Sequence, residues 1–66
     1  MKLIVNGSTL TIDEQSTAAD LMTQLGYQNQ RVALEVNEAI IPKSTHEKFN
    51  LNEGDKIEII KAVGGG

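Results

Sequence analysis

The chain contains no cysteine among its 66 residues. This absence excludes a disulfide framework, a thiol nucleophile and a cysteine-based metal site, and it fits a reducing compartment, where disulfides are rare. Histidine is nearly as scarce, because His46 is the single one and lies beside Glu47 in a polar stretch. We therefore expect His46 to be a surface histidine rather than a metal ligand or a catalytic base.

Basic patches and long apolar runs are also missing. Six Lys and Arg residues against nine Asp and Glu residues give a net charge of −3, whereas nucleic-acid binding favours basic patches. No run approaches the roughly 18 apolar residues that a membrane-spanning helix needs, and the apolar stretch at residues 3–5 is too short for a signal peptide. We expect a soluble cytoplasmic protein with neither a nucleic-acid partner nor a membrane partner.

The small size of the chain limits its chemistry. It forms one domain, and a domain this small buries only about 60% of the surface that its unfolded chain exposes. There is little room for a deep active site. Three acidic groups are present, namely Asp13 with Glu14, Glu35 with Glu38, and Glu53 with Asp55. None accompanies a histidine or a recognisable ligand spacing, so we interpret them as solvated surface, place Asp13 and Asp55 in turns, and predict no metal site and no catalytic residue.

The first residues predict a β-hairpin. Residues 2–6 are apolar and β-branched, and residues 9–13 alternate between polar and apolar side chains, as strands do. Between them lies Asn6-Gly7, a strong signal for a two-residue hairpin turn because both residues tolerate positive φ.

The hydrophobic period then changes to that of a helix. Ser16 or Thr17 can cap the helix, and Asp20 would lie near the positive end of its dipole. Gly26 is placed to end it. Because a helix of about ten residues is unstable alone in water, its apolar stripe must pack on the sheet. The stripe has i, i+3, i+4, i+7 spacing and consists of Ala18, Leu21, Met22 and Leu25.

The second half of the chain predicts three more strands and one loop. The strands cover residues 32–36, 39–41 and 56–61, and the polar loop covers residues 43–52. Asn37-Glu38 can turn the chain into the short middle strand, which Pro42 ends because it lacks an N–H. Phe49 and Leu51 are the expected anchors of the loop at the edge of the core.

This order of elements predicts an α+β fold of the β-grasp type. A mixed sheet of four to five strands carries one helix on one face, and the first and last strands lie side by side and parallel at its centre. We assign residues 1–61 to this domain and residues 62–66 to a flexible C-terminal tail. The expected core residues are Leu3, Val5, Leu10, Ile12, Leu21, Leu25, Val32, Leu34, Val36, Ile57 and Ile59.

The tail ends in Val63-Gly64-Gly65-Gly66. Glycine has no side chain and few limits on φ, so this segment could thread through a channel too narrow for a Cβ. The functional group at its tip is the carboxylate of Gly66. A frayed terminus is the simple alternative. However, the tail directly follows the predicted central strand, and this favours a C-terminus that is bound by another protein.

A partner-docking face is predicted on the side of the sheet away from the helix. Because side chains alternate along a strand, Ile4, Ala33 and Ile60 face outward when their neighbours face the core. One of Ile40 and Ile41 should join them. Single exposed apolar residues are ordinary, but several on neighbouring strands favour an interface.

Three segments resemble the ThiS family, the ubiquitin-like β-grasp sulfur carriers of thiamine (thiazole) biosynthesis. They are Val5-Asn6-Gly7, the central run from Val36 to Pro42, and the run from Leu51 to Ile60 followed by Val63-Gly64-Gly65-Gly66. The short length also suits that family. The nearest rival, the small subunit of molybdopterin synthase (the MoaD family), is usually longer and tends to carry a proline pair before Gly-Gly, and residues 60–63 contain no proline.

The resemblance implies a protein substrate rather than an enzyme. A ThiF-like adenylating enzyme would consume ATP to convert the Gly66 carboxylate into an acyl-adenylate, and a sulfurtransferase or cysteine desulfurase would supply the sulfur that replaces it. The resulting thiocarboxylate would deliver sulfur to a ThiG-like thiazole synthase. Val63, Gly64 and Gly65 would be recognised as the tail, and no cofactor would be bound. Two alternatives stay open: a MoaD-like subunit of molybdopterin synthase, and a ubiquitin-like modifier joined to lysines through Gly66.

Overall fold

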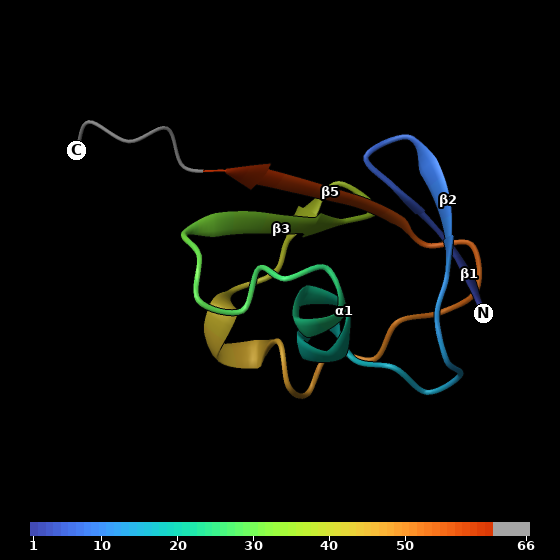
Figure 1. Ribbon diagram of the computed structural model, residues 1–66, viewed down its shortest axis with the longest axis horizontal. Helices are drawn as coiled ribbons and strands as arrows, with labels where there is room; N and C mark the ends of the chain where they lie inside the picture. Colours follow the sequence, from blue (N-terminus) through green and yellow to red (C-terminus); the bar gives the residue numbers. More distant parts are fainter. Residues whose placement is uncertain (62–66) are drawn as a thin grey trace.

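The computed structural model describes residues 1–61. The predicted tail, residues 62–66 with Val63, Gly64, Gly65 and Gly66, lies outside the described residues. Figure 1 shows a sheet with one α-helix packed on one of its faces. The elements are β1 (Lys2–Val5), β2 (Ser8–Thr11), α1 (Ala18–Gln24), β3 (Val32–Val36), β4 (Ala39–Ile40), the 3₁₀ helix η1 (Lys43–Thr45) and β5 (Lys56–Lys61).

The sheet has five strands in the order β2-β1-β5-β3-β4. The two central strands, β1 and β5, run parallel, with Ile4 opposite Lys56 and Val5 opposite Ile57. All other neighbouring strands are antiparallel. This arrangement confirms the predicted β-grasp fold, including the parallel pairing of the first and last strands.

The core lies between the sheet and α1. Its largest fully buried side chains are Leu3, Leu21, Leu34 and Ile57, so β1, α1, β3 and β5 each contribute one. Four expected core residues are only partly buried and pack against the outside of this cluster: Val5, Leu10, Leu25 and Val32. Four residues that were not expected in the core, from the helix and the loops, are buried there instead: Ala18, Met22, Ile41 and Leu51.

Helix α1 begins with a capping box, in which Thr17 rather than Ser16 is the cap. The Thr17 hydroxyl accepts a hydrogen bond from the Asp20 N–H at 3.2 Å, and the Asp20 carboxylate accepts one from the Thr17 N–H at 2.8 Å. Gly26, with φ of +83°, follows the C-cap residue Leu25, which is the usual position for a terminating glycine. The helix has 7 residues and is shorter than the expected ten or so. Among residues 1–61 no helix is long and apolar enough to cross a membrane.

The surface location expected for His46 is wrong. Its side chain is 9% exposed, and its Nε2 lies 3.0 Å from the carbonyl oxygen of Ile41. A carbonyl oxygen only accepts, so Nε2 donates. The residue is buried because η1 folds the loop back against α1, where the His46 carbonyl accepts the Ala19 N–H at 3.0 Å. Its polar sequence neighbours could not reveal this packing.

Two tight turns place non-glycine residues at positive φ. Asn6 and Gly7 have φ of +48° and +85°, and Asn37 and Glu38 have φ of +51° and +72°. Positive φ at both central residues is typical of the type I′ hairpin turn, which suits asparagine and glycine. Glu38 is the exception, because the left-handed conformation is routine only for glycine and occasionally for asparagine and aspartate.

Removing the helix cap should weaken the fold. We expect Thr17→Ala to lower the free energy of unfolding by about 1 kcal/mol, since it leaves the Asp20 N–H without its acceptor. The matched control is Thr23→Ala, an exposed position in the same helix, where the change should stay within about 0.5 kcal/mol. Urea unfolding followed by circular dichroism measures both, and equal losses would contradict the role of the cap.

Relieving the strain at Glu38 should strengthen the fold. We expect Glu38→Gly to raise the free energy of unfolding by roughly 0.5–1 kcal/mol, because the relief of left-handed strain exceeds the entropy cost of a glycine. Glu38→Ala keeps the Cβ and should bring no such gain. A thermal melt of the two variants beside the wild type decides the point, and a lower Tm for Glu38→Gly would contradict it.

Candidate functional site

Strand β5 positions the candidate reactive end of the chain. Gly66 and the tail residues lie outside the described residues, but they follow Lys61, the last residue of β5. β5 pairs with β3 from Ile57, opposite Val36, to Lys61, opposite Val32. Ile57 and Ile59 are buried in the core. The segment after Lys61 therefore starts from a strand that is fixed at the centre of the sheet.

The face of the sheet away from α1 carries every large apolar side chain that is exposed within residues 1–61. These are Ile4, Ile40 and Ile60, with exposed fractions of 43%, 71% and 50%. Exposed Ala33 lies directly opposite Ile60. The buried residue of the Ile40/Ile41 pair is Ile41, so Ile40 is the one that faces outward.

The strand register divides these residues into two groups. Ile40 pairs with Glu35, one row from the Ala33–Ile60 pair, so we call Ala33, Ile40 and Ile60 the outer-face cluster. Ile4 lies opposite Lys56, at the start of β5, and does not share a row with that cluster. The structure thus brings together three of the four apolar residues and leaves Ile4 apart from them.

Two glutamates lie in the same row of the sheet as Ile40, between the row of Ile60 and the row of Ile4. Glu35 on β3 is directly opposite Glu58 on β5, and the Glu35 side chain is half-buried. Like charges in directly opposed positions of a sheet repel each other. The surface therefore combines apolar side chains with an acidic pair that a basic group on a partner would neutralise.

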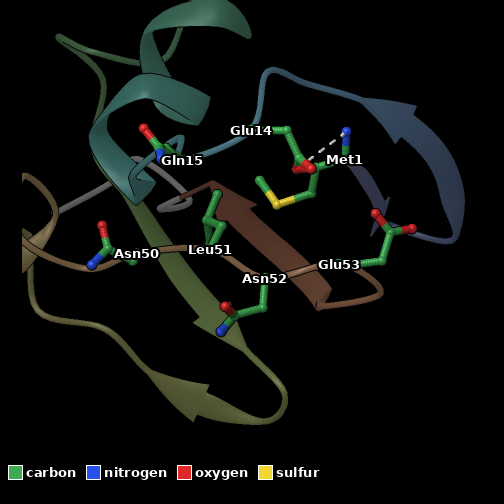
Figure 2. A pocket seen from close by; sticks show the side chains of 7 residues that line it. All are labelled: Met1, Glu14, Gln15, Asn50, Leu51, Asn52 and Glu53. Atoms are coloured by element: carbon green, nitrogen blue, oxygen red, sulfur yellow. Dashed lines mark ion pairs between the residues drawn. The ribbon is translucent and has the colours of Figure 1, made fainter.

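A hollow elsewhere on the molecule has no evident part in carboxylate chemistry. It has a volume of about 710 Å³ and lies beside Met1, at the end of the sheet where β5 begins (Figure 2). The Met1 amino group donates to the Ile12 carbonyl at 2.9 Å and is 4.0 Å from the Glu14 carboxylate. The residues that line this hollow are Met1, Glu14, Gln15, Asn50, Leu51, Asn52 and Glu53.

The remaining acidic groups act in turns or lie at the surface. Asp55 accepts hydrogen bonds from Asn37 Nδ2 at 2.9 Å and from the Asn52 N–H at 2.8 Å, which confirms its predicted place in a turn. Within residues 1–61, no group of three or more His, Cys, Asp and Glu side chains could hold a metal ion.

Sequence reasoning missed one residue beside β5. Asn6 was assigned only to the hairpin turn, yet its Oδ1 accepts the Ile59 N–H at 2.9 Å and its Nδ2 lies 3.4 Å from the Ile59 carbonyl oxygen. The signal in the sequence was Asn6-Gly7, but a turn motif does not indicate which strand the asparagine side chain will contact.

Comparisons with known proteins support the fold. The fold is similar to that of the thiamine biosynthesis protein (ThiS) of Geobacter metallireducens, whose crystal structure aligns over 100% of both chains with a TM-score of 0.85 and 29% identity. In sequence, the chain is 39% identical over 66 residues to a thiazole synthase of Paramagnetospirillum magneticum, of which it covers 20%. It is 32% identical over 62 residues to the uncharacterized protein ycf40 of Porphyra purpurea, of which it covers 87%.

The match to a protein family extends over almost the entire sequence. It runs from residue 3 to residue 66 and so includes both central strands, α1 and the glycine-rich end. With the ubiquitin-like fold described above, this match shows that the chain belongs to the ThiS family.

Proposed function

We propose that the chain is a sulfur carrier in thiamine biosynthesis and that it carries sulfur as a thiocarboxylate at Gly66. The observation that supports this most directly is the family match, which extends from residue 3 through the terminal glycines. Those glycines follow a strand that is held at the centre of the sheet. In this proposal the chain is a protein substrate of its partners rather than an enzyme.

The chemistry explains why the site can consist of one group. A carboxylate is a poor electrophile, so a ThiF-like enzyme first consumes ATP to form an acyl-adenylate at Gly66 and releases pyrophosphate. The terminal sulfur of a persulfide on a sulfurtransferase or cysteine desulfurase then displaces AMP and forms an acyl disulfide. A thiol reduces this S–S bond, which releases the Gly66 thiocarboxylate and leaves a disulfide between the thiol and the donor sulfur. The sulfur is carried on the main-chain end, and the sequence contains no cysteine thiol that could compete for the activated acyl group. The carrier itself binds no cofactor in this scheme.

A thiazole synthase is the proposed acceptor of the sulfur. The chain spans about one fifth of the length of the two thiazole synthases that it matches, those of Paramagnetospirillum magneticum and Magnetococcus marinus. A ThiS-like segment within a thiazole synthase supports a partnership between this chain and a ThiG-like enzyme. These reactions require reducing conditions and ATP, so we place the protein in the cytoplasm.

The folded domain supplies the binding energy that a bare tail would lack. Ordering residues 62–66 costs roughly 5–10 kcal/mol, at about 1–2 kcal/mol per residue, and the terminal glycines have no side chains to offset that cost. We propose that partners dock on the outer-face cluster and that Ile4 extends the contact. A basic group on the partner would lie against Glu35 and Glu58. Docking then raises the effective concentration of the tail at the reactive site.

The first test measures the thiocarboxylate directly. We expect incubation with a ThiF-like enzyme, ATP, a persulfide donor and a thiol reductant to increase the intact mass by about 16 Da, because sulfur replaces one carboxylate oxygen. A chain lacking Gly65 and Gly66 should keep the wild-type Tm but gain no sulfur. Mass spectrometry of protein from its native cell tests the alternatives, since lysine adducts of high mass would instead indicate a covalent modifier.

The second test concerns the docking face. Ile60 is half exposed, so docking can bury about half of a side chain whose full burial contributes about 1.5–3 kcal/mol. We therefore expect Ile60→Ser to raise the KM of the carrier in ATP–pyrophosphate exchange roughly four- to tenfold while leaving kcat unchanged. The matched control is Thr11→Ser, an exposed residue on the same face but far from the outer-face cluster. Equal KM values for the two variants would exclude the cluster as the docking site.

A further inference from the structure

The parallel pairing between β1 and β5 is short. It comprises Ile4 opposite Lys56 and Val5 opposite Ile57, and its last backbone hydrogen bond joins the Asn6 N–H to the Ile57 carbonyl at 2.9 Å. At Asn6 the chain turns away into β2. From Glu58 onward, β5 has no strand beside it on the β1 side.

The Asn6 side chain replaces the missing strand for one residue. Its Oδ1 accepts the Ile59 N–H at 2.9 Å, and its Nδ2 lies 3.4 Å from the Ile59 carbonyl oxygen. One carboxamide thus contacts both backbone groups that Ile59 directs toward the β1 side. Ile59 is therefore the last residue of β5 that is held from both sides, because Ile60 and Lys61 are paired only with β3.

Few residues other than asparagine could make this contact. The position requires positive φ, a donor and an acceptor on one short side chain, and asparagine provides all three. Aspartate would keep the acceptor for the Ile59 N–H but would bring a carboxylate against the Ile59 carbonyl oxygen. Glycine would keep the φ and lose both side-chain contacts.

We propose that Asn6 is a positioning residue that anchors the base of the reactive C-terminal segment, an inference that rests on the proposed sulfur-carrier function. From this anchor the chain can extend Gly66 over at most about 23–25 Å, at ~3.3–3.6 Å per residue. Without the anchor, Ile59 and the two residues after it are held by β3 alone, so the end of β5 opens more often and adds free chain at the base of that segment. The Gly66 carboxylate then reaches the adenylating site of a docked partner less often, whereas docking of the sheet face is unchanged.

The structure provides a matched control in Asn37. It also has positive φ, and its Oδ1 accepts the Lys56 N–H at 3.0 Å. Asn37 thus contacts β5 through its side chain as Asn6 does, but at the beginning of the strand. It also binds Asp55, so Asn37→Gly should destabilise the domain at least as much as Asn6→Gly without releasing Ile59.

The experiment compares Asn6→Gly with Asn37→Gly at a temperature where both are folded. Amide hydrogen exchange on the carrier alone should show lost protection at Ile59 in Asn6→Gly and at Lys56 in Asn37→Gly. In ATP–pyrophosphate exchange with a ThiF-like enzyme, we expect Asn6→Gly to lower kcat roughly five- to thirtyfold, the factor for ordering about one more residue. KM should not change, and Asn37→Gly should retain both wild-type constants.

If Asn6→Gly fails to fold, Asn6→Asp provides a second variant, because aspartate tolerates positive φ as asparagine does. It keeps one of the two contacts, so its kcat should lie between those of the wild type and Asn6→Gly. Retained protection at Ile59, or an equal kcat for the Asn6 and Asn37 variants, would overturn the positioning role alone. Failure of the wild-type chain to be adenylated would overturn the proposed function and this role with it.

Discussion

The parallel pairing of β1 with β5 is the contact on which the rest of the fold depends. It joins the beginning of the sequence to its last described strand, and its two strands bury Leu3 and Ile57 completely. Such a pairing requires a crossover connection, and here the connection contains α1, which covers the core. Strand β5 lies between β1 and β3, although its last residues, Ile60 and Lys61, pair only with β3.

Turn asparagines add hydrogen bonds to both sides of β5, Asn37 on the β3 side and Asn6 on the β1 side, where that pairing has ended. At its start β5 is bound by the Asn37 carboxamide, and near its end by that of Asn6. Each residue reverses the chain and at the same time satisfies a backbone group of a strand distant in sequence. An unpaired backbone group is costly where water cannot reach it. The two hairpin turns and the central strand are therefore one hydrogen-bonded unit, although each turn looks local in the sequence.

Local patterns predicted the elements well, and distant contacts explain what they missed. The strands Val32–Val36 and Lys56–Lys61 have the predicted bounds, because alternation and turn residues mark both ends of each. The burial of His46 depends on how a polar loop packs against α1, and no periodicity encodes that packing. Similarly, alternation placed Ile4 on the correct face, but only the register shows that Lys56, and not Ile60, lies opposite it. The sites assigned to Val63, Gly64, Gly65 and Gly66 stay predictions.

The separation of binding from chemistry explains how so small a domain could serve several partners. The outer-face cluster lies on the strands of the domain, whereas the proposed reactive carboxylate lies beyond the end of β5. A partner that binds the sheet face need not distort the core, because the residues that would contact the partner are already exposed. In the proposed function, a partner would then bind the glycine segment in a narrow channel, and each reactive site would need to recognise only that segment. In the proposed function, the sheet face would determine which enzyme binds, and the Asn6 contact with β5 would limit where the carboxylate can reach.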